Sequence, residues 1–476
     1  MLSGKTRRRP FTTMHRSARI LVAMFQGGGN IPLIMPVMAR LVERGHAVRI
    51  LAGPGVRHSR LQVSAGFVQR IIASGAVLVP FREPPTHPLD NALRKGLLGS
   101  WVPAGFRGVT REAQAAAWAP AWAENVAAES QRVATDLVIS DFVLLGAFAA
   151  AEALAIPSVA LMHTVALRPL PGMPPYGPGW APARGPFGYV RDVFGRAAVE
   201  HIHRRHALPP LNHARASRGL SPLRSPFEQY DRAARTLMLV SAAFDHPNRH
   251  WPANLRHVGT PIDDAGAASW VSAWPPGDAR PLVVVSLSTL NQGQVPLLRR
   301  ILLAVAHINA RVLVTLGPAL PASDFDLPEN VKVERLVPHS AVLPQAAAMV
   351  TQCGIGTLTK ALACGVPLVC VPLVGDQPDN AARVVARGAG VRLPSDAQPD
   401  QIAIAIRRVL DEPRIREAAV RLAAAIAGDG DAAENVVKEI EAVLCAAPAG
   451  CDVGEPPHNR AGHSRAASAG RAIYFF

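Results

Sequence analysis

The stretch VTQCGIGTLTKALACGVPLVC, residues 350–370, decides the fold because it joins an apolar strand to a helix through a glycine turn. The apolar run ends at Val350, small residues follow around Gly354 and Gly356, and an alanine- and leucine-rich segment resumes with helical spacing. Backbone N–H groups at a helix start lack partners, and the helix dipole is positive there. The turn is therefore typical of an anion site, although local geometry alone would also explain its glycines.

Short apolar runs alternate with helical segments on both sides of this stretch. Strands are expected within residues 281–289, 310–317, 331–338, 347–354, 366–373 and 389–394. Strands that alternate with helices form a parallel sheet, whose strand ends all face one edge. The C-terminal half is therefore expected to be a doubly wound α/β domain.

The N-terminal half begins with the same pattern. Residues 18–53 contain a strand at Ile20–Phe25, a glycine turn, a helix and a second strand, which together make a βαβ unit. Two later apolar strands end at Asp141 and at His163. The N-terminal half is therefore expected to hold a second parallel sheet.

The chain has 476 residues, too many for one core, so two domains are expected. The proline- and glycine-rich residues 169–190 within the first domain are expected to be irregular. The expected organisation is a disordered basic extension at 1–17, an N-terminal domain at 18–245, a linker at 246–262, a C-terminal domain at 263–445 and a disordered tail at 446–476.

Composition excludes several classes of protein. The net charge of +15 is spread among scattered arginines and forms no stripe with aromatic residues, which argues against a nucleic-acid partner. Asp141 and Glu152 interrupt the longest apolar run, so no stable membrane insertion is expected. The five cysteines form no Cys-x-x-Cys pair, which favours a reduced, cytoplasmic chain.

Two patterns look like metal sites. Asp324 and Asp326 lie in a proline-flanked loop, where two exposed turn acids are the simpler interpretation. His201, His203 and His206 have ligand-like spacing, but no acid or thiol clusters with them, which favours a solvated helical face. The early GGGNIP segment lacks the dinucleotide fingerprint spacing, so neither a metal nor a nicotinamide cofactor is expected.

Four strand-to-helix loops of the C-terminal half carry small or polar residues. They contain Ser288 with Thr289, the proline turn after Leu336 and Val337, the glycine turn of the 350s, and Asp376 with Gln377. Such loops converge on one crevice in a parallel sheet. Hydroxyls, a glycine-lined helix start and an acid–amide pair suit a phosphate beside a polyhydroxylated group, which is the pattern of a nucleotide-sugar site.

Residues 336–384 resemble the donor-binding signature of the UDP-glycosyltransferase family, whose members include bacterial macrolide and secondary-metabolite enzymes. Residues 27–46 and 136–164 resemble the family's first glycine loop and its acceptor-side acid segment. The resemblance implies an α/β protein of GT-B fold, with two Rossmann-like doubly wound parallel-sheet domains facing a central cleft. It makes residues 18–245 the acceptor-binding domain and residues 263–445 the nucleotide-sugar-binding domain. The donor-binding roles it implies are Leu336 and Val337 beside the base, Gln352, Gly354, Gly356 and Thr357 at the diphosphate, Ser288 and Thr289 also facing the phosphates, and Asp376 and Gln377 at the sugar hydroxyls.

The chain departs from the family pattern at three positions. The family usually has a histidine, its general base, where this chain has Asn30, and the acid that orients that base matches Asp141. A second usual histidine is replaced by Gln352, which can still donate a hydrogen bond to phosphate. Lys360 stands where an acid usually binds ribose, which puts the usual sugar and base preference in doubt.

The function expected from these residues is a metal-independent, inverting hexosyltransferase. It would move a hexose from a UDP- or dTDP-sugar, its co-substrate, to a hydroxyl of an apolar small molecule, and act as a monomer or weak homodimer. Asp141 or His163 would replace the missing base, or the acceptor would be acidic enough to need little help. Two alternatives stay open: a catalytically silent nucleotide-sugar-binding homologue that supports a partner enzyme, and a sugar-nucleotide epimerase, which the acceptor-side resemblance disfavours.

Overall fold

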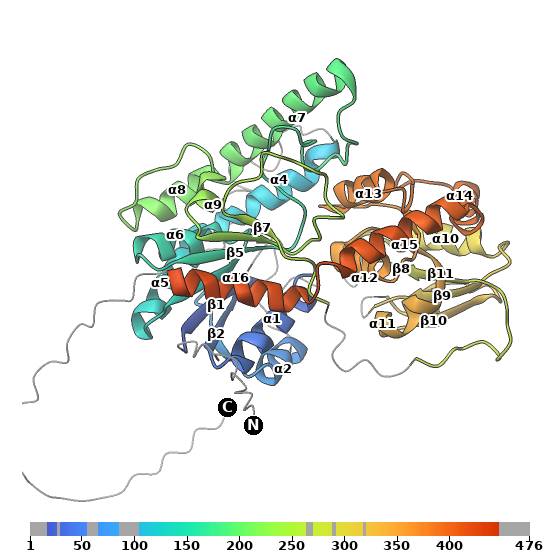
Figure 1. Ribbon diagram of the computed structural model, residues 1–476, viewed down its shortest axis with the longest axis horizontal. Coiled ribbons are helices and arrows are strands. Elements are labelled where there is room, and N and C mark those ends of the chain that lie inside the picture. The colour runs from blue at the N-terminus through green and yellow to red at the C-terminus, as the bar shows by residue number, and fades with distance from the viewer. Residues whose placement is uncertain are drawn as a thin grey trace, which may run out of the picture.

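The computed structural model describes residues 17–25, 29–54, 65–84, 104–262, 270–287, 292–317 and 320–446, which form two α/β domains (Figure 1). The N-terminal sheet has the order β3-β2-β1-β4-β5-β6-β7 and the C-terminal sheet the order β10-β9-β8-β11-β12-β13. All strand pairings among the described residues are parallel, so both expected parallel sheets and the two-domain α/β class are confirmed.

A strand lies at each apolar run that predicts one, and the N-terminal sheet also contains β3, β6 and β7, for which no strand was predicted. The N-terminal strands are β1 (Arg19–Phe25), β2 (Ala47–Gly53), β3 (Val77–Pro80), β4 (Leu137–Asp141), β5 (Ser158–Met162), β6 (Arg235–Met238) and β7 (Leu255–His257). The C-terminal strands are β8 (Leu282–Ser286), β9 (Arg311–Thr315), β10 (Val331–Glu334), β11 (Ala346–Thr351), β12 (Leu368–Cys370) and β13 (Gly390–Arg392).

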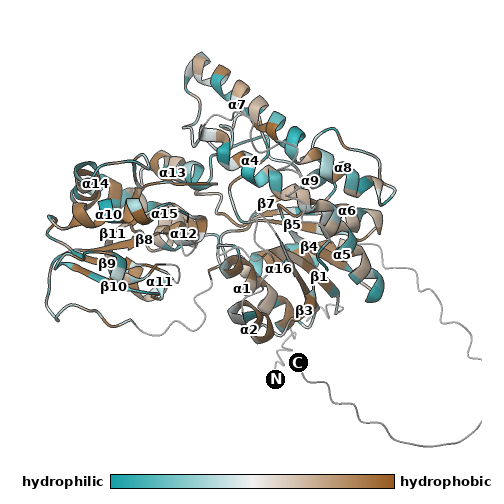
Figure 2. Ribbon diagram, turned by 180° about the vertical axis from the view of Figure 1, so that it is seen from behind, coloured by the Kyte–Doolittle hydropathy of each residue, from teal (hydrophilic) through white to brown (hydrophobic). Residues whose placement is uncertain are grey.

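Helices cover both faces of the sheets. Those of the N-terminal half are α1 (Ile31–Glu43), α2 (Ala65–Ala73), α4 (Arg107–Gln114), α5 (Ala119–Arg132), α6 (Leu145–Ala153), α7 (Gly185–His206), α8 (Leu208–Ala216) and α9 (Glu228–Asp231). Those of the C-terminal half are α10 (Val295–Val305), α11 (His339–Val342), α12 (Ile355–Ala363), α13 (Gln377–Ala386), α14 (Pro399–Asp411), α15 (Pro413–Ala427) and α16 (Ala432–Ala446). Figure 2 shows apolar strands between helices whose outer faces are more polar.

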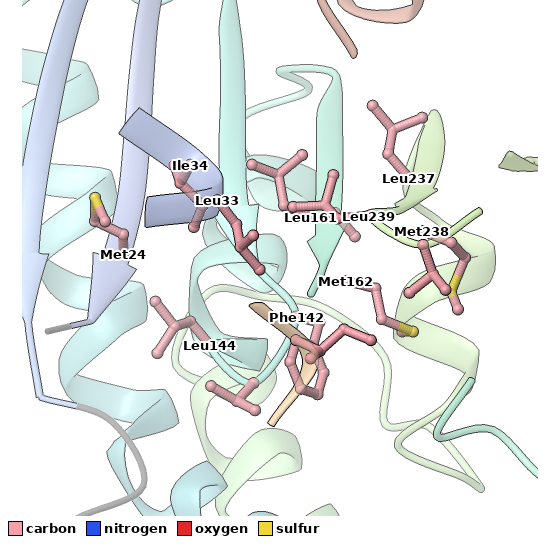
Figure 3. Packing of buried hydrophobic residues seen from close by; sticks show 14 of the residues in the cluster. Met24, Leu33, Ile34, Phe142, Leu144, Leu161, Met162, Leu237, Met238 and Leu239 are labelled. Atoms are coloured by element: carbon pink, nitrogen blue, oxygen red, sulfur yellow. The ribbon is translucent and has the colours of Figure 1, made fainter. Parts of the chain in front are cut away.

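Burial on both faces explains the continuous apolar runs of the central strands, because a parallel sheet leaves neither face to solvent. Every residue of β4, β5 and β8 is buried. Figure 3 shows Leu33 and Ile34 of α1 near Leu161 of β5, within the same buried cluster. The helices are thus fixed to the sheet by side-chain packing, which sets the position of the loops at the sheet edge.

The structure differs from the expected organisation in three places. The range 246–262, expected as a linker, contains β7, the edge strand of the N-terminal sheet. Helix α16, expected in the C-terminal domain, lies on the N-terminal domain beside α1, because Arg40 and Arg44 of α1 pair with Glu434 (Figure 1). The irregular segment ends early, since α7 begins at Gly185.

The histidine segment of α7 differs from the solvated helical face that was expected. His203 and His206 are buried within α7 and not on a solvated face, because the helix packs against α4 and α8. Within the described residues no group of histidine, cysteine and acidic side chains could hold a metal ion. No helix among them has both the length and the apolar character that crossing a membrane requires.

A buried ion pair joins the two domains. Arg383 Nε on α13 lies 2.7 Å from Oδ1 of Asp245, which follows β6, and His257 Nε2 lies 3.2 Å from Oδ2 of the same carboxylate. Burial alone would raise the pKa of Asp245, but Arg383 and His257 hold it well below its ordinary value. The charge of Asp245 is therefore stable inside the interface only while its partners are present.

Replacing Arg383 with methionine should leave Asp245 buried without its guanidinium partner, with His257 as the remaining ionisable group beside the carboxylate. We expect Arg383→Met to lower the free energy of unfolding by about 3–5 kcal/mol, measured by denaturant titration. Arg408→Met is the matched control, because Arg408 pairs with Glu412 on the surface, where such pairs contribute about 0–1 kcal/mol. A double variant with Asp245→Asn should recover part of the loss, and equal effects of Arg383→Met and Arg408→Met would contradict this account.

Candidate active site

Asn30, Asp141 and His163 meet at the edge of the N-terminal sheet. The strand order reverses direction between β1 and β4, and ligands of open α/β sheets bind at such a point. Asp141 ends β4, Asn30 precedes α1, and His163 follows β5. His163 Nε2 lies 2.9 Å from Asp141 Oδ2, and Asn30 Nδ2 donates to the same oxygen at 3.1 Å. The structure therefore brings the three expected acceptor-side residues together.

The surroundings of His163 set its protonation. Its ring packs against Phe142 with a centroid distance of 5.0 Å and is mostly buried. Burial disfavours the charged imidazolium, but the Asp141 carboxylate outweighs this and raises the pKa of His163 above its ordinary value. When Nε2–H donates to Asp141, Nδ1 carries the lone pair that can accept a proton.

Asn30 occupies the position where a histidine was expected, and its side chain has a structural role. Its Nδ2 also donates to the carbonyl oxygen of Phe25 at 2.8 Å. The amide thus ties the end of β1 to Asp141 across the start of α1. An amide nitrogen is not a base at neutral pH, so Asn30 holds Asp141 in place and leaves His163 as the titratable partner.

The start of α12 lies at the corresponding reversal of the C-terminal sheet, between β8 and β11. A Cβ added at Gly356 would lie 3.9 Å from the carbonyl oxygen of Gly29, so the glycine turns of the two domains face each other. Gly354, Gly356 and Thr357 are partly exposed there. The unpaired N–H groups of this helix start therefore point into the region between the domains, where an anion would be stabilised.

Cys353 makes the turn into α12 possible, a feature that the sequence did not indicate. Its φ is 68°, in the left-handed region that usually requires glycine. Its carbonyl oxygen accepts a hydrogen bond of 2.9 Å from Asn380 Nδ2, and its N–H donates to Thr351 Oγ1 at 3.2 Å. These bonds hold β11, α12 and α13 together at the site.

Asp376 and Gln377 begin α13 beside this turn. Asp376 Oδ2 accepts a hydrogen bond of 2.8 Å from Asn380 Nδ2, and burial raises the pKa of Asp376 above its ordinary value. Gln377 Oε1 accepts the N–H groups of Leu373 and Val374, while its Nε2 donates to Gln292 Oε1 at 2.9 Å. The Gln377 amide thus shapes the loop that presents Asp376.

The remaining expected donor residues lie along the same edge. Leu336, just beyond β10, is 67 % exposed although it is apolar, and Val337 beside it is partly buried. Gln352 is buried at the end of β11. Ser288 and Thr289 lie outside the residues that the structure describes.

Sequence reasoning missed the contacts that close the interface. The N–H groups of Gly177 and Gly179 donate to Asp379 at 2.7 and 3.2 Å, and Arg392 Nη1 donates to the Gly179 carbonyl at 2.5 Å. These bonds hold the irregular segment before α7 against α13. Asp379 lies two residues after Gln377, so its place at the site could have been predicted from that spacing. Glu112 of α4 also lies beside this loop, near Gly375, but no motif in the sequence surrounds it.

Comparisons with known proteins identify relatives of the chain. A family model described as "Erythromycin biosynthesis protein CIII-like, C-terminal domain" matches residues 299–443. The chain is 30 % identical over 416 residues to the 4'-demethylrebeccamycin synthase of Lentzea aerocolonigenes, covering 85 % of this chain and 94 % of that protein.

Solved structures agree in fold. The glycotransferase of kitacinnamycin superposes with a TM-score of 0.66 at 20 % identity, covering 90 % of this chain and all of the other. The glycosyltransferase VinC in complex with dTDP gives a TM-score of 0.63 at 22 % identity, covering 90 % of this chain and 99 % of the other. At these identities the likeness establishes the fold alone, which is GT-B.

The contact between His163 and Asp141 can be tested by titration. In the unliganded protein, we expect the His163 imidazole signals in NMR to titrate above the ordinary histidine pKa, because the carboxylate stabilises the charged ring. Asp141→Asn removes that charge and should lower the pKa of His163, while the backbone amide signal of exposed His213 should be the same in both proteins. An unchanged pKa of His163 in the variant would contradict the pairing.

Proposed function

Because this chain belongs to the UDP-glycosyltransferase family and is a glycosyltransferase, we propose that it moves a hexose from a UDP- or dTDP-sugar to a hydroxyl of an apolar small molecule. The reaction inverts the anomeric centre and needs no metal. The observation that carries this proposal is the hydrogen bond between His163 and Asp141, opposite the helix start of α12. A proton acceptor and an anion-stabilising helix start thus lie on the two sides of one interface.

The helix start of α12 replaces the metal in this mechanism. As the sugar departs, negative charge develops on the diphosphate, and fixed N–H donors stabilise it without reorganisation. Gly354 and Gly356 present no side chain there, so the phosphates can approach the backbone closely. The solved complex of VinC with dTDP supports a nucleoside diphosphate as the ligand of this fold.

His163 takes the role of base that Asn30 cannot fill. Asp141 holds the imidazole through Nε2, so the proton of the acceptor hydroxyl passes to Nδ1. The acceptor oxygen then attacks the anomeric carbon from the face opposite the diphosphate. The bond between the anomeric carbon and the phosphate oxygen breaks, the diphosphate leaves, and the configuration inverts. The Asp376 carboxylate helps to raise the pKa of His163, and His163 acts to lower that of Asp376, which supports a base close to the loop proposed to bind the sugar.

A second candidate function rests on Asn30. Its amide donates to Asp141 and thereby competes with His163 for the same carboxylate oxygen. If this competition keeps Asp141 from orienting His163 as a base, the protein would bind the nucleotide sugar without transferring it. It would then be a catalytically silent homologue that supports a partner enzyme.

The test combines nucleotide sugars with phenolic and aliphatic acceptors and reads the products by mass. We expect His163→Gln to reduce turnover by about 10²–10⁴-fold, the usual contribution of a placed base, with EDTA having no effect. Phenols should be the better acceptors, because a hydroxyl of pKa near ~10 needs less help than an aliphatic alcohol. The base must be neutral, so the rate should rise with pH through a pKa above that of ordinary histidine.

Asn30→His provides the matched comparison. It should raise the rate with aliphatic alcohols if Asp141 can orient the new imidazole. If the wild-type protein binds UDP or dTDP but yields no product with any donor and acceptor, the silent homologue takes precedence. Loss of turnover in EDTA with recovery in magnesium would overturn the metal-free mechanism.

A further inference from the structure

Large apolar side chains are exposed on the first turns of α7. Phe187 and Phe194 are 90 % and 72 % exposed, although the outer face of a helix in a globular protein is ordinarily polar. Val190 lies three residues after Phe187 and four before Phe194, so these three side chains share one face of the helix. Tyr189 and Val193 beside them are also more than half exposed. These five side chains form an apolar stripe about two helical turns long.

The apolar stripe faces away from the body of the protein. Helix α7 projects beyond the rest of the N-terminal domain in both ribbon views (Figures 1 and 2). Its last residue adjoins α8, so the projecting end consists of the first turns, which carry the stripe. On the opposite side of the helix, Val199 and Ile202 are buried in the core cluster. Because it is exposed, the stripe contributes neither to the core nor to the buried contacts of Asp141.

The apolar stripe is too large to be an incidental feature of the surface. An aromatic side chain carries about 150–250 Å², so Phe187 and Phe194 alone expose on the order of 300 Å². Single exposed apolar residues are common on globular proteins, whereas contiguous patches of this size mark interaction sites. The stripe lies on the convex outer surface of one helix, so a partner must cover it from outside.

Exposed arginines accompany the apolar stripe. Arg184 directly precedes α7, while Arg204 and Arg205 are exposed near its end, about three turns beyond the stripe. Helix α4, which packs against α7, adds Arg107 and Arg111, both exposed and one turn apart. These five arginines form no ion pair with an acid in the part of the chain that the structure describes.

Acidic residues do little to offset this positive charge. The two acids of α7 are Asp192, which is buried and paired with Arg191, and Glu200, which is partly buried. The whole chain carries a net charge of +15. Exposed aromatic residues together with arginines on one helix are the combination that binds the interface of an anionic membrane.

Charge and shape distinguish between the possible occupants of the apolar stripe. A second copy of the chain, bound through the same stripe, would bring two sets of arginines together, and like charges repel. An acidic protein would need a groove shaped to this helix, whereas a fluid lipid interface adapts to a convex surface. Anionic lipids also attract each arginine, which raises the affinity roughly fivefold per residue.

We propose that α7 docks the protein on the surface of a membrane that contains anionic lipids. Because the apolar stripe runs along the helix, α7 lies parallel to the membrane, with Phe187 and Phe194 between the headgroups and the acyl chains. The arginines stay at the level of the lipid phosphates, where their charge remains hydrated. This docking is separate from the proposed function, because it needs neither a nucleotide sugar nor an acceptor.

Co-sedimentation of the full chain with vesicles tests the proposal. Vesicles of phosphatidylcholine alone are compared with vesicles of equal parts phosphatidylcholine and phosphatidylglycerol. We expect the protein to partition onto the anionic vesicles about tenfold or more strongly, and we expect this difference to shrink as salt screens the arginines.

Paired variants of apolar residues test the stripe itself. Phe187→Ser with Phe194→Ser should reduce partitioning onto the anionic vesicles about tenfold or more, because neither ring is then buried in the interface. Leu303→Ser with Ile404→Ser is the matched control, since these residues of α10 and α14 are 64 % and 62 % exposed, and it should leave partitioning unchanged. Both double variants should unfold at the wild-type temperature, because the side chains that change are exposed.

Paired variants of arginines separate local from overall charge. Arg204→Gln with Arg205→Gln should reduce partitioning about tenfold or more. Arg299→Gln with Arg407→Gln removes the same charge from exposed residues of the C-terminal domain and should change partitioning about twofold at most. Equal effects of the two pairs would contradict docking through α7.

Two further results would overturn the proposal. One is a wild-type protein that does not bind anionic vesicles, or a phenylalanine variant that binds them as strongly as the wild type, which would make an acidic protein the better occupant. The other comes from sedimentation velocity without vesicles. A wild-type dimer that the phenylalanine variant converts to a monomer would show that the apolar stripe joins two copies of the chain.

Discussion

The buried carboxylate of Asp141 is the interaction around which the acceptor side of the molecule is organised. An ionised group inside a protein must be paired, since an unpaired buried charge costs several kcal/mol. Here the donors come from three segments: the Asn30 amide, the His163 ring and the N–H group of Val143 at 3.3 Å. The need to satisfy one carboxylate thus fixes the start of α1 and the ends of β4 and β5 relative to one another.

The same requirement operates between the domains. Asp245 and Asp379 are buried at the interface, and each is satisfied by groups from the opposite domain: Asp245 by Arg383, and Asp379 by the N–H groups of Gly177 and Gly179. Such hydrogen bonds are directional, so they fix the relative orientation of the two domains more specifically than apolar packing would. They also bring acids into a region of low dielectric constant, and burial there raises the pKa of Glu112 to about 8 and that of Asp379 to about 7.

Much of the framework could be predicted from the sequence, because strands buried on both faces are continuous apolar runs and the glycine turns mark where they meet helices. The placement of strand β7 and of the C-terminal helix α16 could not be predicted. Strand β7 has only three residues, and the packing of α16 on α1 depends on pairs such as Arg44 with Glu434, which are 390 residues apart. Cys353 escaped notice because a left-handed residue in a turn is expected to be glycine.

On the acceptor side, too, some features could be predicted from the sequence and others could not. The sequence predicted that two strands end at Asp141 and at His163, and the structure brings these two residues within hydrogen-bond distance. The role of Asn30 as a second donor to Asp141 was not foreseen, because a departure from the family pattern indicates what is missing and not what replaces it. Glu112 was not predicted for another reason: an acid on a short amphipathic helix ordinarily faces solvent, whereas here Glu112 Oε1 accepts a hydrogen bond from the Tyr176 hydroxyl.

The central claim is that the two sheet reversals form one site, with the glycine turns of both domains around the nucleotide sugar. Hydrogen exchange of the backbone amides, with and without dTDP or UDP in EDTA, tests it most directly. The account expects the nucleotide to slow exchange at Gly354–Thr357, where the helix N–H groups would bind phosphate, and at residues 29–34 opposite them. Nucleotide binding that leaves exchange at the start of α12 unchanged would contradict it.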